Sequence, residues 1–245
     1  MLTVTNGQPL EIQPADIEAV WGRIFKAIKK DAFEKSADLE KRINSLGLEG
    51  SRIFIPIPTN EVLSLPHPDE GKYVVRISNS VENVDWASTL VVRSQLQKSE
   101  IKRFQNAFGA SVDGTSDLIY QWRIDILNAD RIPPSILAKE GGDNFAHLGI
   151  SFDNPSNGFV DLMRSGQIAM ILAGDIEWVL SSNESTDFIG ASLSRPKQTS
   201  FRRYTIRFKL AGIEIVTGDF KTVLANCSLV EPEASTQALK SKSGF

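Results

Sequence analysis

The feature that most limits the fold of this chain is an alternation of apolar and polar side chains in two segments, residues 118–127 and 201–210. Successive side chains of a β-strand point to opposite faces, so a period of two predicts strands with one buried and one solvated face. In the first segment the apolar face consists of Leu118, Tyr120, Trp122, Ile124 and Ile126. In the second it consists of Tyr204, Ile206, Phe208 and Leu210.

Shorter runs of β-branched and aromatic residues predict further strands at 52–57, 72–78 and 146–152. Pro56 confines the first of these to an edge or to a short strand, because proline cannot donate a ladder hydrogen bond. Residues 167–172 and 176–181 predict a hairpin around 173–175, with a buried helix as the alternative. Ala211 and Gly212 predict a turn between 201–210 and a further strand at 213–217.

The strands follow one another without the regular strand–helix alternation of a parallel sheet. Seven to nine strands of this kind predict an α+β fold with an antiparallel β-rich body, either a sandwich or barrel-like. We expect this body to span residues 51–230. Residues 231–245, rich in Ser, Lys and Ala, are expected to form a solvated C-terminal tail.

The N-terminal segment, residues 1–50, has a helical period instead. After Pro14 the apolar residues recur every three or four positions: Ile17, Val20, Trp21, Ile24, Phe25 and Ile28. A mixed-charge stretch predicts a second helix toward Leu46, and Gly47 is a suitable stop. We expect this segment to pack on the body; the alternative, a basic helix lying on a membrane, fits its interleaved acids less well. Short helices are also expected at 98–108 and 159–164.

Composition limits the classes of partner and compartment. The net charge is −3, which argues against a generally cationic protein that coats nucleic acid. Cys227 is the single cysteine, and the N-terminus lacks the basic-then-apolar pattern of a secretion signal. No apolar run is long enough to cross a bilayer. We therefore expect a cytoplasmic protein without membrane insertion.

The residues of common catalytic and metal sites are scarce. His67 lies between two prolines in an expected loop, and His147 lies in an apolar strand pattern. Cys227 follows an apolar stretch typical of an inert buried thiol. One cysteine and two separated histidines do not supply a zinc site, and the chain has no phosphate-binding glycine motif. We therefore predict no catalytic residue, no metal site and no cofactor.

A metal-dependent hydrolase or nuclease that uses carboxylates is the alternative. Three acid-x-Lys triplets begin at Glu70, Glu100 and Asp219, and in a chain with 30 acidic residues about two are expected by chance. Asp219 follows a predicted strand, but it lacks an upstream strand that carries an acid, because residues 188–213 contain no acidic residue. The candidate carboxylates of this alternative are Asp175, Glu177 and Asp219.

The strongest charge asymmetry is an interval from Phe188 to Ile213 that contains no acidic residue. Its six basic residues are Arg195, Lys197, Arg202, Arg203, Arg207 and Lys209. In a strand, Arg203, Arg207 and Lys209 share one face, where they could bind successive phosphates or carboxylates. The alternative is a solvated sheet face paired with acids of neighbouring strands, or an edge protected from aggregation.

The scarcity of catalytic groups favours a non-enzymatic binding or assembly protein over a hydrolase. Its expected partner is another protein or a second copy of the chain. The basic residues at 195–209, which we call the basic strand, also predict contact with an anionic partner such as nucleic acid.

Overall fold

The computed structural model describes residues 2–78, 81–84, 87–105, 108–139, 145–192 and 194–229. The tail expected at 231–245 lies outside the described residues. Strands predominate among the described residues, where three α-helices accompany them. The predicted α+β class with a β-rich body is therefore confirmed.

The helices are α1 (Ile17–Ile28), α2 (Ser36–Ser45) and α3 (Asn157–Arg164). The strands of the described residues are β1 (Leu2–Pro9), β2 (Arg52–Ile57), β3 (Val62–His67), β4 (Lys72–Ile77), β5 (Val81–Val84), β6 (Ala87–Gln105), β7 (Ser111–Ile126), β8 (Leu137–Lys139), β9 (Phe145–Asp153), β10 (Ile168–Glu177), β11 (Asn183–Ile189), β12 (Lys197–Thr217) and β13 (Thr222–Ser228).

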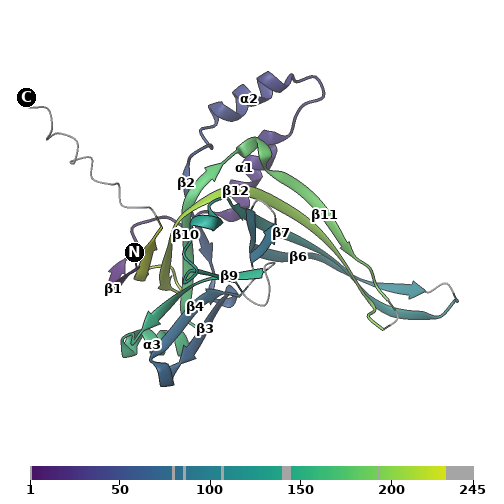
Figure 1. Ribbon diagram of the computed structural model, residues 1–245. Helices are drawn as coiled ribbons and strands as arrows, with labels where there is room; N and C mark the ends of the chain where they lie inside the picture. Colours follow the sequence, from purple (N-terminus) through teal and green to yellow (C-terminus); the bar gives the residue numbers. More distant parts are fainter. Residues whose placement is uncertain are drawn as a thin grey trace, which may run out of the picture.

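These strands form one branched sheet (Figure 1). Its main path runs β1-β13-β12-β7-β6-β5-β9-β4-β3, while β10 joins β12 to β2, β11 pairs with β12, and β8 pairs with β9. The ladders of the described strands are antiparallel except that of β7 with β12, which is parallel over Lys197–Phe208. The two segments that alternate most strongly in sequence thus lie side by side, and their apolar faces cover the same core.

Two predicted hairpins are wrong, because each is a single long strand. β12 continues through Gly212, and β10 continues through Gly174. At Gly174 a Cβ atom would collide with the carbonyl oxygen of Lys209 and the ring of Phe208, and the register with β12 shifts there. The glycines therefore permit a bulge and a close approach of backbones, and they do not form turns.

The helix predicted at 98–108 is also wrong, because β6 runs to Gln105 and pairs with β7 as far as Ser111. Ile101 and Phe104 have a helical spacing, but long-range pairing overrides it. The loop predicted around His67 is wrong as well. Pro66 and His67 belong to β3, which pairs only with β4 among the described strands. An edge position tolerates the missing N–H of proline.

The helices follow the predicted pattern. Asp16 caps α1 by accepting a hydrogen bond from the Ala19 N–H at 3.2 Å. The second predicted helix is α2, and Gly47 follows it with φ +58°. The helix predicted at 159–164 is α3. The edge position predicted for 52–57 is confirmed too, since among the described strands β2 pairs only with β10.

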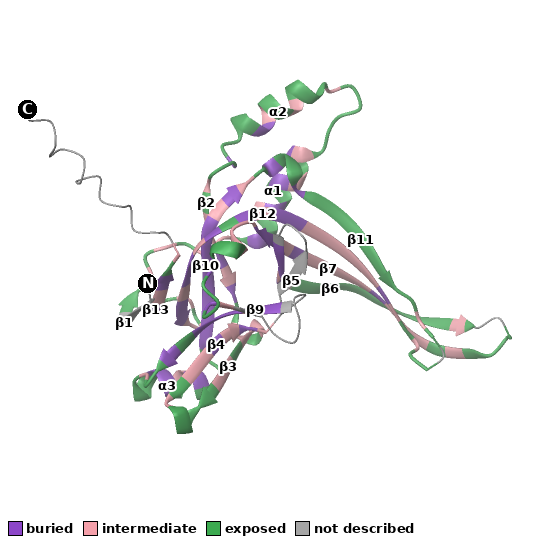
Figure 2. Ribbon diagram, viewed as in Figure 1, coloured by how far each residue is buried: buried purple, intermediate pink, exposed green. Residues whose placement is uncertain are grey.

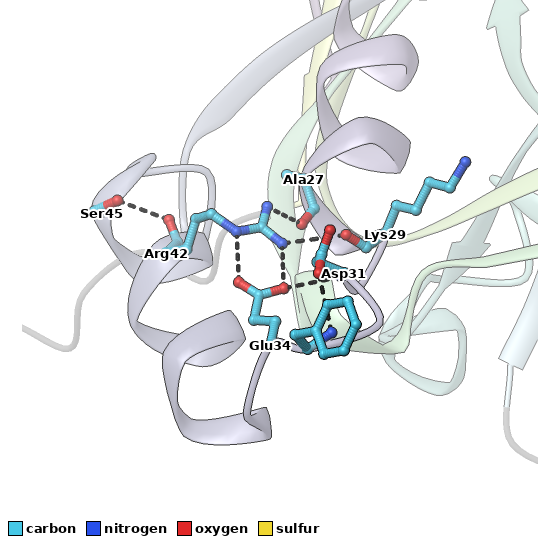
Figure 3. Close-up of polar contacts among 7 residues, drawn as sticks. Ala27, Lys29, Asp31, Glu34, Arg42 and Ser45 are labelled. Atoms are coloured by element: carbon cyan, nitrogen blue, oxygen red, sulfur yellow. Dashed lines mark hydrogen bonds and ion pairs between the residues drawn. The ribbon is translucent and has the colours of Figure 1, made fainter.

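Arg42 connects the two N-terminal helices (Figure 3). Its guanidinium donates to both carboxylate oxygens of Glu34 at 2.9 Å and to the backbone carbonyls of Ala27 and Lys29 at the end of α1. A bidentate arginine therefore satisfies carbonyls that the last turn of α1 leaves free. The Arg42 guanidinium lowers the pKa of the Glu34 carboxyl.

The core lies beneath α1 and around β10. Trp21 and Ile24 of α1 are buried against the sheet, and the Trp21 indole N–H donates to the carbonyl of Tyr204 at 3.1 Å. Residues 168–173 of β10 are all buried, because this strand lies between β12 and β2. Figure 2 shows that burial is concentrated in this body, whereas α2 and the far ends of β6 and β11 are mostly exposed.

Candidate functional site

The predicted basic residues lie along the first half of β12 and in the turn before it. The register with β7 places Lys197, Arg203 and Arg207 on one face, together with Lys209 two residues farther on. Arg202 lies on the opposite face. Arg195 is exposed in a tight turn in which its N–H donates to the carbonyl of Ser192.

Three of the six basic side chains pair with acids of neighbouring strands. Lys197 bonds Asp117 of β7 at 2.9 Å, Arg203 bonds Asp187 of β11 at 3.1 Å, and Arg202 lies 3.5 Å from Glu184. Hydrogen bonds from Ser99 and Lys197 lower the pKa of the Asp117 carboxyl. The acids that neutralise these basic side chains thus belong to the neighbouring strands β7 and β11.

The other basic residues differ in their surroundings. The Arg207 guanidinium lies 5.0 Å from the ring centre of Trp178 and interacts electrostatically with Asp125. Burial nevertheless raises the pKa of Asp125, which accepts a hydrogen bond from Thr89 at 2.6 Å. Lys209 is exposed and makes no ion pair with any described residue. Anion binding by this strand stays a prediction, and its ion pairs provide a structural reason for the charge.

The carboxylates of the hydrolase alternative line different cavities. Asp175 forms an ion pair with Arg52 beside a cavity of about 360 Å³, whereas Asp219 lines one of about 610 Å³. A hydrogen bond from Thr217 lowers the pKa of Asp219. Glu177 lies opposite Arg207 in the ladder of β10 with β12. Among the described residues, no group of three His, Cys, Asp or Glu side chains is placed to hold a metal ion.

The three residues considered as nucleophile or base lie in separate parts of the sheet. Cys227 of β13 is buried, and burial raises the pKa of its thiol, which disfavours the reactive thiolate. His67 is exposed on β3, and His147 is half-buried on β9.

The structure shows a further surface that sequence reasoning missed. β6, β7, β11 and β12 extend beyond the body as a sheet that we call the arm: residues 94–105, 111–120, 183–189 and 197–203, with the tip at Phe108 (Figure 1). Five large apolar side chains are exposed on it: Leu96 (56%), Ile101 (85%), Phe108 (95%), Phe188 (59%) and Ile189 (39%).

Both edges of the arm are open among the described strands. β5 covers the outer edge of β6 only at Ala87–Leu90, and beyond that point β6 pairs with β7 alone. Every side chain from residue 94 to 103 of this edge is exposed. β11, at the other edge, pairs with β12 alone, and all seven of its residues are exposed. Thr89, Val91 and Val92, three β-branched residues that lead into this edge, are the sequence signal that could have indicated a strand here.

An aromatic groove lies where the arm meets α1. It has a volume of about 400 Å³ and is lined by Trp21, Phe25, Tyr120, Trp122 and Tyr204, with Glu18, Gly22 and Gln97 at its margin. The Arg93 guanidinium lies 5.4 Å from the ring centre of Trp122 and bonds Glu18 at 2.9 Å. Beyond this groove, α1 no longer covers the sheet.

Comparison with protein-family models, with curated proteins and with solved structures finds no match for this chain. Within the described residues, the helices are too short or too polar for any of them to cross a lipid bilayer.

Proposed function

We propose that this protein is a non-enzymatic structural protein that associates through its arm with other protein subunits, copies of its own chain among them. The observation that carries the proposal is the exposure of five large apolar side chains on a sheet that projects from the body. Single exposed apolar residues are ordinary, but a series of them on one projecting element is typical of a surface that is covered in an assembly.

The open edges of the arm support the same proposal. A strand edge presents unpaired N–H and C=O groups that pair readily with another chain. Monomeric proteins keep such edges short or cover them, whereas no described strand covers the edge of β6 from residue 94 to residue 105. The arm therefore presents two edges of backbone groups that a strand of a neighbouring chain can pair with.

The ion pairs of β12 favour the apolar side chains and open edges of the arm over its basic side chains as the main contact surface. Asp117, Glu184 and Asp187 already neutralise three of the basic side chains. An anionic partner would have to displace these carboxylates, and that competition reduces the net gain of each new contact.

The proposal is tested by sedimentation velocity of the full chain over a wide range of protein concentration. We expect the parent to sediment with a mass above the 27.0 kDa of one chain. An arm variant with Leu96→Ser, Ile101→Ser, Phe108→Ser and Phe188→Ser is expected to remain at the mass of one chain.

The matched control replaces the same number of exposed apolar side chains outside the arm: Phe33→Ser, Leu46→Ser, Leu63→Ser and Leu180→Ser. This control is expected to associate like the parent. A parent that stays at the mass of one chain at all concentrations, or an arm variant that associates as well as the control, contradicts the proposal.

A further inference from the structure

The exposed edge of β6 has a charge pattern that is complementary to itself. Around Ile101 the edge reads Lys98-Ser99-Glu100-Ile101-Lys102-Arg103-Phe104. Glu100 bonds Lys98 of its own strand at 2.6 Å, whereas Lys102 makes no ion pair with any described residue. One acid and one base therefore precede and follow Ile101 in the strand, and the Ile101 side chain is 85% exposed.

We propose that β6 pairs antiparallel with β6 of a second copy of this chain, with Ile101 opposite Ile101 of the second copy. This inference rests on the proposed function and names the partner and the register. A two-fold axis through this pair brings residue 100 opposite residue 102 twice, so each Glu100 faces a Lys102. Paired residues of adjacent strands point to the same face, so the two Ile101 side chains cover each other.

Other registers fit less well. A slip of one residue reverses the face of every side chain and sets Ile101 opposite a charged residue. A two-fold axis at Ser99 also pairs Lys98 with Glu100, but it places Ile101 opposite Gln97. There the ladder of β6 with β7 is interrupted between Leu96 and Lys98. The register centred on Ile101 uses the uninterrupted stretch from Lys98 to Phe104.

The pairing would join the two arms into one continuous sheet. Each copy contributes its strands in the order β11-β12-β7-β6, and the new ladder lies between the two β6 strands. The interface is isologous and closed, so it yields a dimer and leaves the β11 edges outermost.

The decisive experiment exchanges charges between two variants of the full chain. In Glu100→Lys alone, the introduced lysine faces Lys102 twice, and in Lys102→Glu alone, the introduced glutamate faces Glu100 twice. Like charges directly opposite are destabilising, so each variant is expected to dimerise about tenfold or more weakly than the parent. In an equimolar mixture both pairs become opposite charges, and heterodimers of parent affinity are expected. Sedimentation with one variant fluorescently labelled measures them.

A matched control mixture combines Glu100→Lys with Lys98→Glu. In the register centred on Ile101, Lys98 faces Phe104, so a heterodimer in this mixture keeps one like-charge pair and is expected to be weaker than the parent dimer. Recovery of parent affinity in this control, in place of the first mixture, would identify the register centred on Ser99 and overturn the proposal.

Cysteine crosslinking gives a second readout that does not depend on charge. Paired residues of antiparallel strands have Cα atoms about 4.5–5.5 Å apart, a distance that a disulfide can span. Ile101→Cys, in a Cys227→Ala background, is expected to form a disulfide-linked dimer under mild oxidation. Ser99→Cys is expected not to, because its counterpart lies four residues along the strand. Crosslinking through residue 99 and not 101 would contradict the register.

The experiments give different results if only the pairing of β6 is wrong and if the proposed function itself is wrong. If the parent associates through the arm but neither the charge exchange nor the crosslink of the Ile101→Cys variant succeeds, the proposed pairing is wrong and the arm remains the assembly element. If the parent never exceeds the mass of one chain, both are wrong.

Discussion

Replacement of Trp21 by alanine tests how α1 is held on the body. Trp21 is 1% exposed, belongs to the main core and donates its indole N–H to the carbonyl of Tyr204 at 3.1 Å. Truncation of a buried tryptophan leaves a cavity and typically costs about 3–5 kcal/mol. The lost hydrogen bond, worth about 1 kcal/mol, is already part of that cost. We therefore expect Trp21→Ala to lower the free energy of unfolding by about 3–5 kcal/mol.

The assay is equilibrium urea unfolding followed by far-UV circular dichroism, which does not depend on the removed fluorophore. Phe33→Ala is the matched control, because Phe33 is an aromatic residue of the same N-terminal segment but is 95% exposed. It is expected to change the free energy of unfolding by less than about 0.5 kcal/mol. A loss below about 1 kcal/mol for Trp21→Ala, at an unchanged dependence on urea, would refute the packing of α1 described above.

Three further perturbations test local contacts. Arg42→Ala removes the contacts that Arg42 makes in Figure 3, and we expect proteolysis between α1 and α2 to become at least about tenfold faster. Arg42→Lys is expected to be cleaved as fast as Arg42→Ala, because lysine cannot form the bidentate pair with Glu34. An unchanged rate of proteolysis would count against this role of Arg42. Gly174→Ala brings a Cβ atom against the β12 backbone and is expected to lower the free energy of unfolding, measured by thermal unfolding, by about 1–3 kcal/mol. Gly22→Ala places its Cβ in open space within α1 and is expected to raise the free energy of unfolding by about 0.5–1 kcal/mol. Equal effects of the two substitutions would contradict the register of β10 with β12. Burial raises the pKa of Glu214 above 4.5, so its folded form binds a proton more tightly than its unfolded form. The free energy of unfolding should therefore decline as the pH rises from the ordinary pKa of glutamate through the raised pKa of Glu214. Glu214→Gln should remove that decline and be more stable than the parent at pH 7. Parallel pH profiles of the parent and the variant in urea unfolding would contradict this role of Glu214.

The elements with an unambiguous period could be predicted from sequence. β7, α1 and α3 follow from alternation or from a helical stripe, because burial of one face is a local property that the sequence records. The hairpins expected at Gly174 and Gly212 could not be distinguished from long strands, since glycine serves equally in a turn and in a close approach of two backbones. Only the partner strand decides between them.

The candidate surface was harder to predict for the same reason. Ile101 and Phe104 have a spacing that favours a helix, and only pairing with a strand after the tip shows them to be part of an arm. The ion pair of Arg203 with Asp187, and that of Lys197 with Asp117, join residues whose proximity depends on the β11–β12 and β7–β12 ladders. The pattern of residues within β7 or within β12 does not indicate that these two strands pair in parallel.

Hydrogen–deuterium exchange of the full chain, compared at a dilute and at a concentrated condition, tests the central claim that assembly uses the arm. We predict slower exchange on concentration in peptides that cover residues 94–105 of β6. β3 is an internal control, because it is also an edge strand among the described strands but belongs to the body. Peptides covering residues 62–67, and those covering the basic residues at 202–209, should exchange at unchanged rates. New protection confined to β3 or to the basic strand, with none in β6, would contradict the account.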